Sequence, residues 1–189
     1  MMNYFRRRLL QFNTNMSNLS AGCVGMPTGR ASGSAGYPVM GDESIMCAKA
    51  NGTSAVPIQQ NLRYGCDTKL ADNICNHNRH YAEHSGYWKK TSWVQDVQSN
   101  GEVTYYDSNT GKPLFIAPRG RDFAAFKEES ASHGWPSFRD AEVVWENVRC
   151  LPSSEMVSVD GTHLGHNIPD RKGNRYCINL VSVAGNPKL

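Results

Sequence analysis

Short β-prone runs that end at turn residues fill the chain from about residue 88 onward and restrict what it can fold into. Residues 93–98 end at Ser-Asn-Gly, residues 102–106 end at Ser-Asn-Thr-Gly, and residues 114–116 end just before a proline. Because such runs pair most simply with their neighbours across tight turns, they predict an antiparallel meander. Strand signals return in four later segments, residues 142–145, 148–150, 156–159 and 175–183. The fold class is therefore predicted to be mostly β.

The best helix candidate is residues 121–129, with the sequence RDFAAFKEE. Asp122 is a suitable N-cap because its carboxylate can accept a backbone N–H of the first turn. Phe123 and Phe126 fall on one face at helical spacing. One or two short helices are therefore expected beside the strands.

The chain of 189 residues is long enough for one domain preceded by an extended N-terminal region. Residues 1–41 contain no acidic residue and carry four arginines, which is typical of an organellar transit peptide, with the mitochondrion as the simplest destination. A disordered basic tail on a cytoplasmic protein is the alternative. Residues 42–85 form an N-terminal extension of unassigned role, and residues 86–189 are the expected core.

Composition argues against two classes of partner. The chain is 39% hydrophobic and 20% charged, and no apolar run approaches the ~20 residues that span a bilayer. The net charge of +3 is thinly spread, with no basic stripe interleaved with aromatic residues for nucleic acid. Neither a membrane nor a nucleic acid is expected as a partner, and a monomer is the expected state.

The six cysteines lie at positions 23, 47, 66, 75, 150 and 177, without a CxxC pair. Four of them precede the expected core, and no secretory signal favours a disulfide-stapled domain. Cys66, Cys75, His77 and His80 form a loose set of potential zinc ligands, although their spacing matches no standard finger.

Cys177 is the candidate nucleophile. In a strand, Arg175, Cys177 and Asn179 share one face, while Tyr176 and Ile178 share the other. A guanidinium beside a thiol favours the thiolate, which is the reactive form. A buried core cysteine is the plainer alternative, but an Arg and an Asn on the same face would then need buried partners.

Two further motifs precede this strand. His163 and His166, with Asp170 four residues further on, could converge on one pocket and hold a proton near neutral pH. A metal-binding pair and ordinary surface histidines are the alternatives. Trp135, in a rigid Gly-Trp-Pro turn, offers an aromatic face to a methyl group with partial positive charge, unless it is a core tryptophan.

Taken together, these motifs resemble the B-type methionine-R-sulfoxide reductase family over about residues 86–183. Four segments carry the resemblance in the family's order, namely GKPLF at 111–115, GWPSF at 134–138, HLGH at 163–166 and RYCIN at 175–179.

The resemblance implies a core of two antiparallel sheets. It implies that Cys177 is the nucleophile and that Trp135 and Phe138 contact the substrate. It also implies that five further residues bind the sulfoxide oxygen, directly or through water, and deliver protons: His163, His166, Asp170, Arg175 and Asn179. No cofactor is implied beyond an external thiol reductant, such as thioredoxin, glutaredoxin or glutathione. The implied substrate is methionine sulfoxide, either free or within oxidised proteins.

The chain departs from the family in three places. Many members hold a structural zinc with two CxxC pairs, but the matching positions here are Asp107 and Thr110, and near Val157 and Asp160. We therefore expect no structural metal site. Residues 131–133, which match the resolving cysteine of some members, contain no cysteine, and residues 171–174 form an unusually short connection.

Reduction of the resulting Cys177 sulfenic acid requires a second thiol. Cys150 is the one other cysteine of the expected core and a candidate resolving residue, although a structural role is favoured, and Cys66 and Cys75 are rivals. The competing functions are a zinc-binding interaction module, a non-catalytic binder of oxidised methionine, and a cysteine hydrolase using Cys177 with His163 or His166.

Overall fold

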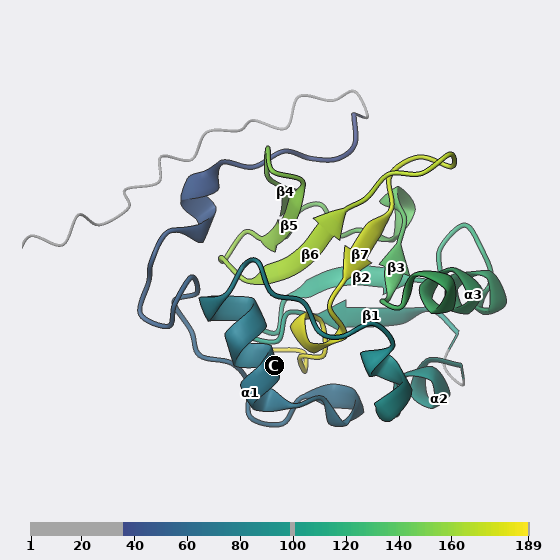
Figure 1. Cartoon of the computed structure of the whole chain (residues 1–189), viewed down its shortest axis with the longest axis horizontal. Helices are drawn as coiled ribbons and strands as arrows, with labels where there is room; N and C mark the ends of the chain where they lie inside the picture. The colour runs from purple at the N-terminus through teal and green to yellow at the C-terminus, as the bar shows by residue number, and fades with distance from the viewer. Residues whose placement is uncertain (1–35, 99–100, 189) are drawn as a thin grey trace, which may run out of the picture.

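The computed structural model describes residues 36–98 and 101–188 (Figure 1). The predicted transit peptide therefore falls largely outside the described residues, as does Cys23. The strands are β1 (Val103–Tyr106), β2 (Pro113–Ala117), β3 (Ser137–Phe138), β4 (Val148–Cys150), β5 (Glu155–Ser158), β6 (His163–Asn167) and β7 (Tyr176–Ile178). The α-helices are α1 (Thr68–Asp72), α2 (Trp93–Gln98) and α3 (Phe123–His133). Short 3-10 or π turns are η1 (Glu43–Met46), η2 (Arg63–Gly65), η3 (Asn73–His77), η4 (Tyr87–Lys90), η5 (Asp140–Glu142) and η6 (Leu180–Ser182).

The strands form two antiparallel sheets, which confirms the predicted mostly β class. β1 pairs with β2, and five strands form the larger sheet in the order β3-β7-β6-β5-β4. Figure 1 shows the larger sheet across the middle of the molecule, with α3 beside β3. Within the described residues, no helix is both long and apolar enough to cross a bilayer.

A bulge at Leu164 decides how the two histidines of β6 lie. Val157 of β5 pairs with His163, whereas the adjacent Met156 pairs with Gly165, so β6 carries one extra residue. In a regular strand, residues three apart face opposite sides of the sheet. The bulge corrects this offset and turns His163 and His166 to the same face, with ring centroids 5.6 Å apart.

The register of the large sheet also aligns one residue from each of four strands. Ser137 pairs with Cys177, Cys177 with His166, and His166 with Glu155. Directly paired residues share a face, so these four residues form a row across the sheet. The candidate nucleophile and one candidate proton donor are therefore cross-strand neighbours.

The opposite face of the sheet packs into the main hydrophobic core. The ring of Phe138 stacks on Phe115 of β2 with centroids 4.3 Å apart, and it meets Tyr105 of β1 and Phe126 of α3 at 5.1 Å and 5.4 Å. These aromatic contacts join the two sheets to α3. Tyr176 and Ile178 are fully buried in the same cluster, as the predicted alternation along residues 175–179 requires.

Residues before position 86 also belong to this core. Ile58, Leu62, Ile74 and Cys75 are buried in the same hydrophobic cluster as the strands. The expectation that Cys66 and Cys75 lie outside the folded core is therefore wrong, because both are buried in it.

Three predicted strands are corrected by the structure. Residues 93–98 form the helix α2, because Trp93 and Val97 are both buried at a helical spacing of four and Ser92 closes the first turn on Asp96 at 2.6 Å. Residues 142–145 pair only through a single bridge at Val143, since Glu142 ends the turn η5. The predicted strand at 175–183 stops at residue 178, and η6 follows.

The predicted helix at residues 121–129 is confirmed as α3, which extends to His133. The Asp122 carboxylate accepts the N–H of Ala125 at 2.8 Å, as expected for an N-cap. Gly134 ends the helix with φ of 88°, a backbone conformation that glycine adopts readily. The helix thus delivers the chain directly into the Gly-Trp-Pro turn.

Candidate functional site

Four of the predicted site residues line one pocket, although they lie up to 44 positions apart in the sequence (135 to 179). The pocket has a volume of about 150 Å³ and is lined by Ala82, Trp135, Gly165, His166, Ile168, Cys177 and Asn179. The lining is mainly apolar, with one thiol, one imidazole and one amide. A pocket of this size holds a side chain rather than a large cofactor.

Cys177 is partly exposed in this pocket, while its strand neighbours are buried. Burial raises the pKa of the Cys177 thiol, and the adjacent Arg175 guanidinium offsets this only in part. The predicted effect of Arg175, which favours the thiolate, is therefore present, but burial outweighs it. The resting group is the thiol at neutral pH.

His166 is exposed at the pocket. Partial desolvation and the neighbouring His163 lower the pKa of His166, so its imidazole is mainly neutral near pH 7. A neutral imidazole both donates and accepts a hydrogen bond. His166 can therefore exchange protons with its cross-strand neighbour Cys177 and with a ligand in the pocket.

His163 lies behind His166 and is only 1% exposed. Its Nδ1 is 2.7 Å from the Glu155 carboxylate. Arg79 donates to the same carboxylate from Nε at 3.0 Å and also from Nη2. Burial alone would raise the pKa of Glu155, but the hydrogen bonds from His163 and Arg79 lower it to about 2.

Asn179 is held in one orientation by two backbone contacts. Its Oδ1 accepts the N–H of Glu83 at 3.1 Å, and its Nδ2 donates to the Leu164 carbonyl at 3.1 Å. The amide carries two N–H donors. Because Asn179 also lines the pocket, the remaining donor is available to an oxygen atom bound there.

Glu83 connects the pocket wall to the segment that follows β7. Its buried carboxylate accepts the backbone N–H groups of Leu180 and Val181 at 2.9 and 3.1 Å. Its backbone carbonyl accepts Nε1–H of Trp135 at 3.0 Å. Burial raises the pKa of Glu83 to about 7, despite these hydrogen bonds. One residue of the N-terminal segment therefore fixes both Trp135 and Asn179.

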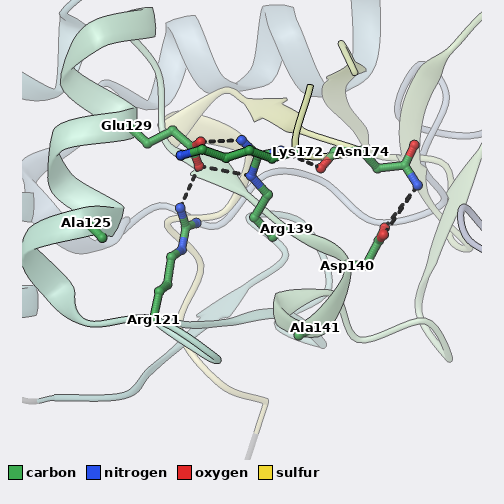
Figure 2. A pocket seen from close by; sticks show the side chains of 8 residues that line it. All are labelled: Arg121, Ala125, Glu129, Arg139, Asp140, Ala141, Lys172 and Asn174. Atoms are coloured by element: carbon green, nitrogen blue, oxygen red, sulfur yellow. Dashed lines mark hydrogen bonds and ion pairs between the residues drawn. The ribbon is translucent and has the colours of Figure 1, made fainter. Parts of the chain in front are cut away.

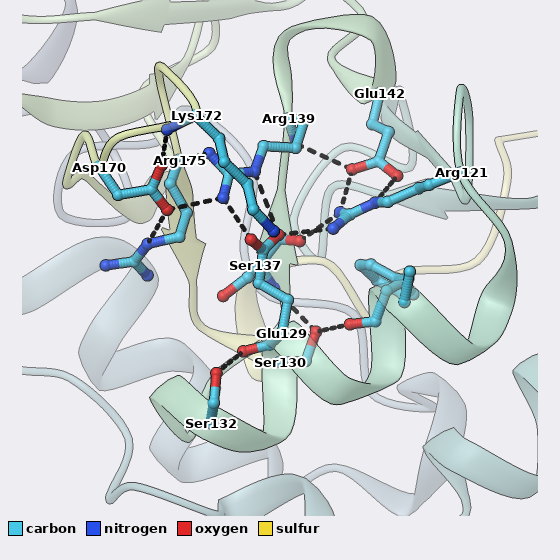
Figure 3. A network of polar contacts seen from close by, with 12 residues as sticks. Arg121, Glu129, Ser130, Ser132, Ser137, Arg139, Glu142, Asp170, Lys172 and Arg175 are labelled. Atoms are coloured by element: carbon cyan, nitrogen blue, oxygen red, sulfur yellow. Dashed lines mark hydrogen bonds and ion pairs between the residues drawn. The ribbon is translucent and has the colours of Figure 1, made fainter.

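Arg175 and Asp170 lie beside the pocket and do not line it. Arg175 is 6% exposed, and its Nε and Nη1 have no hydrogen-bond partner among the described residues. Its Nε is 3.8 Å from Asp170. Asp170 is held by two hydrogen bonds from Arg139, of 3.0 and 2.7 Å (Figure 3). The structure thus places Asp170 where it can act on the pocket through Arg175.

A larger hollow of about 420 Å³ is lined by residues of this ion network, including Arg121, Glu129 and Arg139 (Figure 2). Both Arg121 and Arg139 pair with Glu129, while Arg121 also pairs with Glu142 and Arg139 with Asp170. The hollow therefore offers no unpaired guanidinium to a ligand. Arg139 instead holds the Asp170 carboxylate in place.

The structure does not bring Phe138 or Cys150 to the pocket. Phe138 is fully buried in the core on the opposite face of the sheet. Cys150 lies on β4, where it pairs with Met156 of β5, and β4 is three strands away from β7. Strands are spaced ~4.8 Å apart, which separates the two cysteines by about 14 Å, whereas a disulfide needs Cα atoms within ~7 Å. Neither the predicted substrate contact of Phe138 nor a resolving role of Cys150 fits this arrangement.

Asp107, one of the positions that match zinc ligands in the family that the sequence resembles, lies at the centre of a hydrogen-bonded network. The buried Asp107 carboxylate accepts the N–H of Asn109 at 2.8 Å and the hydroxyl of Thr162 at 3.0 Å. Among the described residues, no three His, Cys, Asp or Glu side chains are grouped as metal ligands. The loose set of Cys66, Cys75, His77 and His80 is therefore not assembled, since both cysteines are buried and both histidines exposed.

Sequence reasoning missed the three charged residues that support the pocket: Arg79, Glu83 and Glu155. Two of them lie in the segment of unassigned role, and no local motif marks any of the three. Arg79 and Glu83 make contacts with residues 76 to 98 positions away, and a single sequence does not reveal such contacts. No known protein-family model matches the chain.

Proposed function

We propose that this protein is a thiol-dependent methionine-R-sulfoxide reductase of the B type, with Cys177 as its nucleophile. One observation carries the proposal: residues of three separate motifs, Trp135, His166 and Cys177, line one pocket together with Asn179. The pocket combines an aromatic wall, a thiol, a neutral imidazole and an amide donor, which are the groups that sulfoxide reduction requires.

In the proposed reaction, the Cys177 sulfur attacks the sulfoxide sulfur and forms an S–S bond with it, while the thiol proton passes through His166 to the sulfoxide oxygen. The hydroxyl then moves to the Cys177 sulfur as the S–O bond of the substrate breaks, and the electron pair of the S–S bond returns to the substrate sulfur. Cys177 is left as a sulfenic acid and the substrate leaves as the thioether, so that one thiol and one sulfoxide give one sulfenic acid and one sulfide. The free donor of Asn179 supports the oxygen, and Trp135 contacts the methyl group.

Two equivalents of an external thiol then convert the sulfenic acid back to the thiol, with release of water and a disulfide. The distance between β4 and β7 argues against Cys150 as the partner. We therefore assign reduction directly to an external thiol such as thioredoxin, glutaredoxin or glutathione. A monomer in an organelle, reducing free or protein-bound methionine sulfoxide, remains part of the proposal.

The second candidate is a non-catalytic binder of oxidised methionine. The raised pKa of Cys177 favours it, because a resting thiol is a weaker nucleophile than a thiolate. The two functions differ in turnover, since a binder would take up the sulfoxide without converting it.

The test is turnover of the two methionine sulfoxide epimers with dithiothreitol, for the wild type, Cys177→Ser and the matched control Cys150→Ser. We expect reduction of the R epimer alone, lost in Cys177→Ser and kept within about twofold in Cys150→Ser. Absence of turnover for both epimers by folded protein would sink the reductase. Saturable binding of the R epimer by that inactive protein would instead favour the binder.

A further inference from the structure

Arg79, Glu155 and His163 form a chain of contacts that ends beside His166, with Arg79 partly exposed and the other two residues buried. Glu155 is 4% exposed and His163 is 1% exposed. His163 Nδ1 lies 2.7 Å from Glu155 Oε1, and Arg79 Nε lies 3.0 Å from both carboxylate oxygens. Arg79 also pairs with Glu43 at 2.8 Å, which anchors its guanidinium. The chain couples the N-terminal segment to the sheet.

This arrangement fixes which nitrogen of His163 carries its proton. Glu155 is ionised at neutral pH and offers acceptors only. A nitrogen 2.7 Å from a carboxylate must therefore be the donor, so the proton sits on Nδ1. In the neutral ring, the lone pair is then on Nε2.

That lone pair has no partner within the described part of the chain, although the Nε2 atom is buried. A buried acceptor without a partner is costly, which indicates that a donor reaches it in the working protein. The neighbouring group is His166, with its ring centroid at 5.6 Å. His166 in turn lies opposite Cys177 on the next strand.

We propose that Glu155, anchored by Arg79, is a positioning residue that holds His163 in the Nδ1–H form, so that Nε2 accepts a proton from the His166 side of the pocket. This inference rests on the proposed reductase function for its effect on turnover. The ionisable groups facing His163 are Glu155 from β5 and the neutral His166 from its own strand, with Arg79 beyond Glu155. His80 also lies close enough to His166 to disfavour its cationic form.

The first measurement is the tautomer of His163 in the full chain, read from its imidazole ¹⁵N shifts at neutral pH. We expect Nδ1–H in the wild type and a mixed or reversed tautomer in Glu155→Gln, because the amide of Gln can also donate. Glu155→Asp should restore the wild-type tautomer at least in part. An Nε2–H tautomer in the wild type overturns the proposal without the need for any variant to fold.

The second measurement is the kinetics of R-sulfoxide reduction by the same variants. Glu155→Gln should lower kcat at least tenfold and change KM less than twofold, since the substrate contacts are intact. Glu102→Gln, which breaks the exposed pair with Arg119, is the matched control and should leave both constants unchanged. A changed tautomer with unchanged kcat would overturn the assigned role.

The two readouts separate this inference from the proposed function. If the wild type shows the Nδ1–H tautomer and Glu155→Gln loses it, but neither protein turns over the sulfoxide, Glu155 is the positioning residue and the reductase function fails. If the wild type turns over and the tautomer is the same in both proteins, the inference fails and the reductase function stands.

Discussion

Cys177 and His166 lie directly opposite each other on the antiparallel strands β7 and β6. Their side chains share the pocket face, and directly opposed residues have Cβ atoms ~5 Å apart. Burial raises the pKa of the thiol, and partial desolvation lowers that of the imidazole. Both groups are therefore neutral near pH 7, and their cross-strand placement makes His166 the candidate partner for proton transfer with Cys177.

Replacement of His166 tests this relationship. We expect His166→Ala to lower kcat for methionine-R-sulfoxide about a hundredfold, because a positioned acid–base group contributes roughly 10²–10⁴ in rate. His77→Ala, which removes an exposed histidine that pairs with Asp72 at 3.7 Å, is the matched control. Steady-state kinetics of both variants provide the measurement, and an unchanged kcat in His166→Ala would assign the proton transfer to another group.

The raised thiol pKa predicts how alkylation of Cys177 depends on pH. Since iodoacetamide reacts with the thiolate, the rate should rise with pH, with a midpoint above that of glutathione measured alongside. Loss of the guanidinium in Arg175→Leu should move the midpoint higher still, because Arg175 lowers this pKa. Arg171→Leu, at an exposed position, should have no effect.

Site-resolved mass spectrometry separates Cys177 from the other cysteines in this alkylation experiment. A midpoint below pH 7 would contradict the dominance of burial. It would show that the Arg175 guanidinium outweighs burial in setting the pKa of Cys177.

The sequence predicts the parts of the fold that depend on local pattern. The strands at 103–106, 113–117 and 148–150 follow from alternation and turn residues, and α3 follows from its Asp122 cap. Prediction fails where the local pattern is ambiguous. Residues 93–98 contain β-prone side chains, but tertiary packing buries Trp93 and Val97 along one helical face.

The candidate site likewise contains residues that short motifs predict and features that they do not. Trp135, His166, Cys177 and Asn179 could be found in short motifs, and they line one pocket. The bulge at Leu164 has no signal in the sequence, yet it decides that His163 and His166 share a face. Phe138 belongs to the same motif as Trp135 but points the opposite way, because successive strand residues alternate.

Glu83 predicts a dependence of stability on pH. Its pKa is about 7 in the folded protein, against an ordinary 4.5. Between these two pH values the folded state keeps a proton that the unfolded state releases. The stabilisation of the folded state by protonated Glu83 is therefore complete below pH 4.5 and is lost as the pH rises to about 7. A shift of this size corresponds to at most roughly 3 kcal/mol.

Urea unfolding of the wild type and Glu83→Gln from pH 4.5 to 8 measures this effect. Gln cannot titrate, and the other ionisable groups are common to both proteins. The free energy of unfolding of the wild type should therefore fall relative to the variant as the pH rises. A difference that stays constant over this range would place the folded-state pKa of Glu83 near its ordinary value.

The hydrogen-bonded network around Asp107 lies where zinc-containing members of the family that the sequence resembles hold their metal. We predict that the Asp107 carboxylate stabilises this region. Asp107 is fully buried and accepts hydrogen bonds from the Asn109 backbone and the Thr162 hydroxyl. Asp107→Ala leaves these donors unsatisfied, each at about 1–3 kcal/mol, so we expect the free energy of unfolding to fall by roughly 3 kcal/mol. Asp122→Ala, which removes only the cap of α3, should cost about 1 kcal/mol. Thermal unfolding with and without a chelator completes the test: a wild-type Tm that drops on chelation would show that a metal, rather than Asp107, holds this part of the fold.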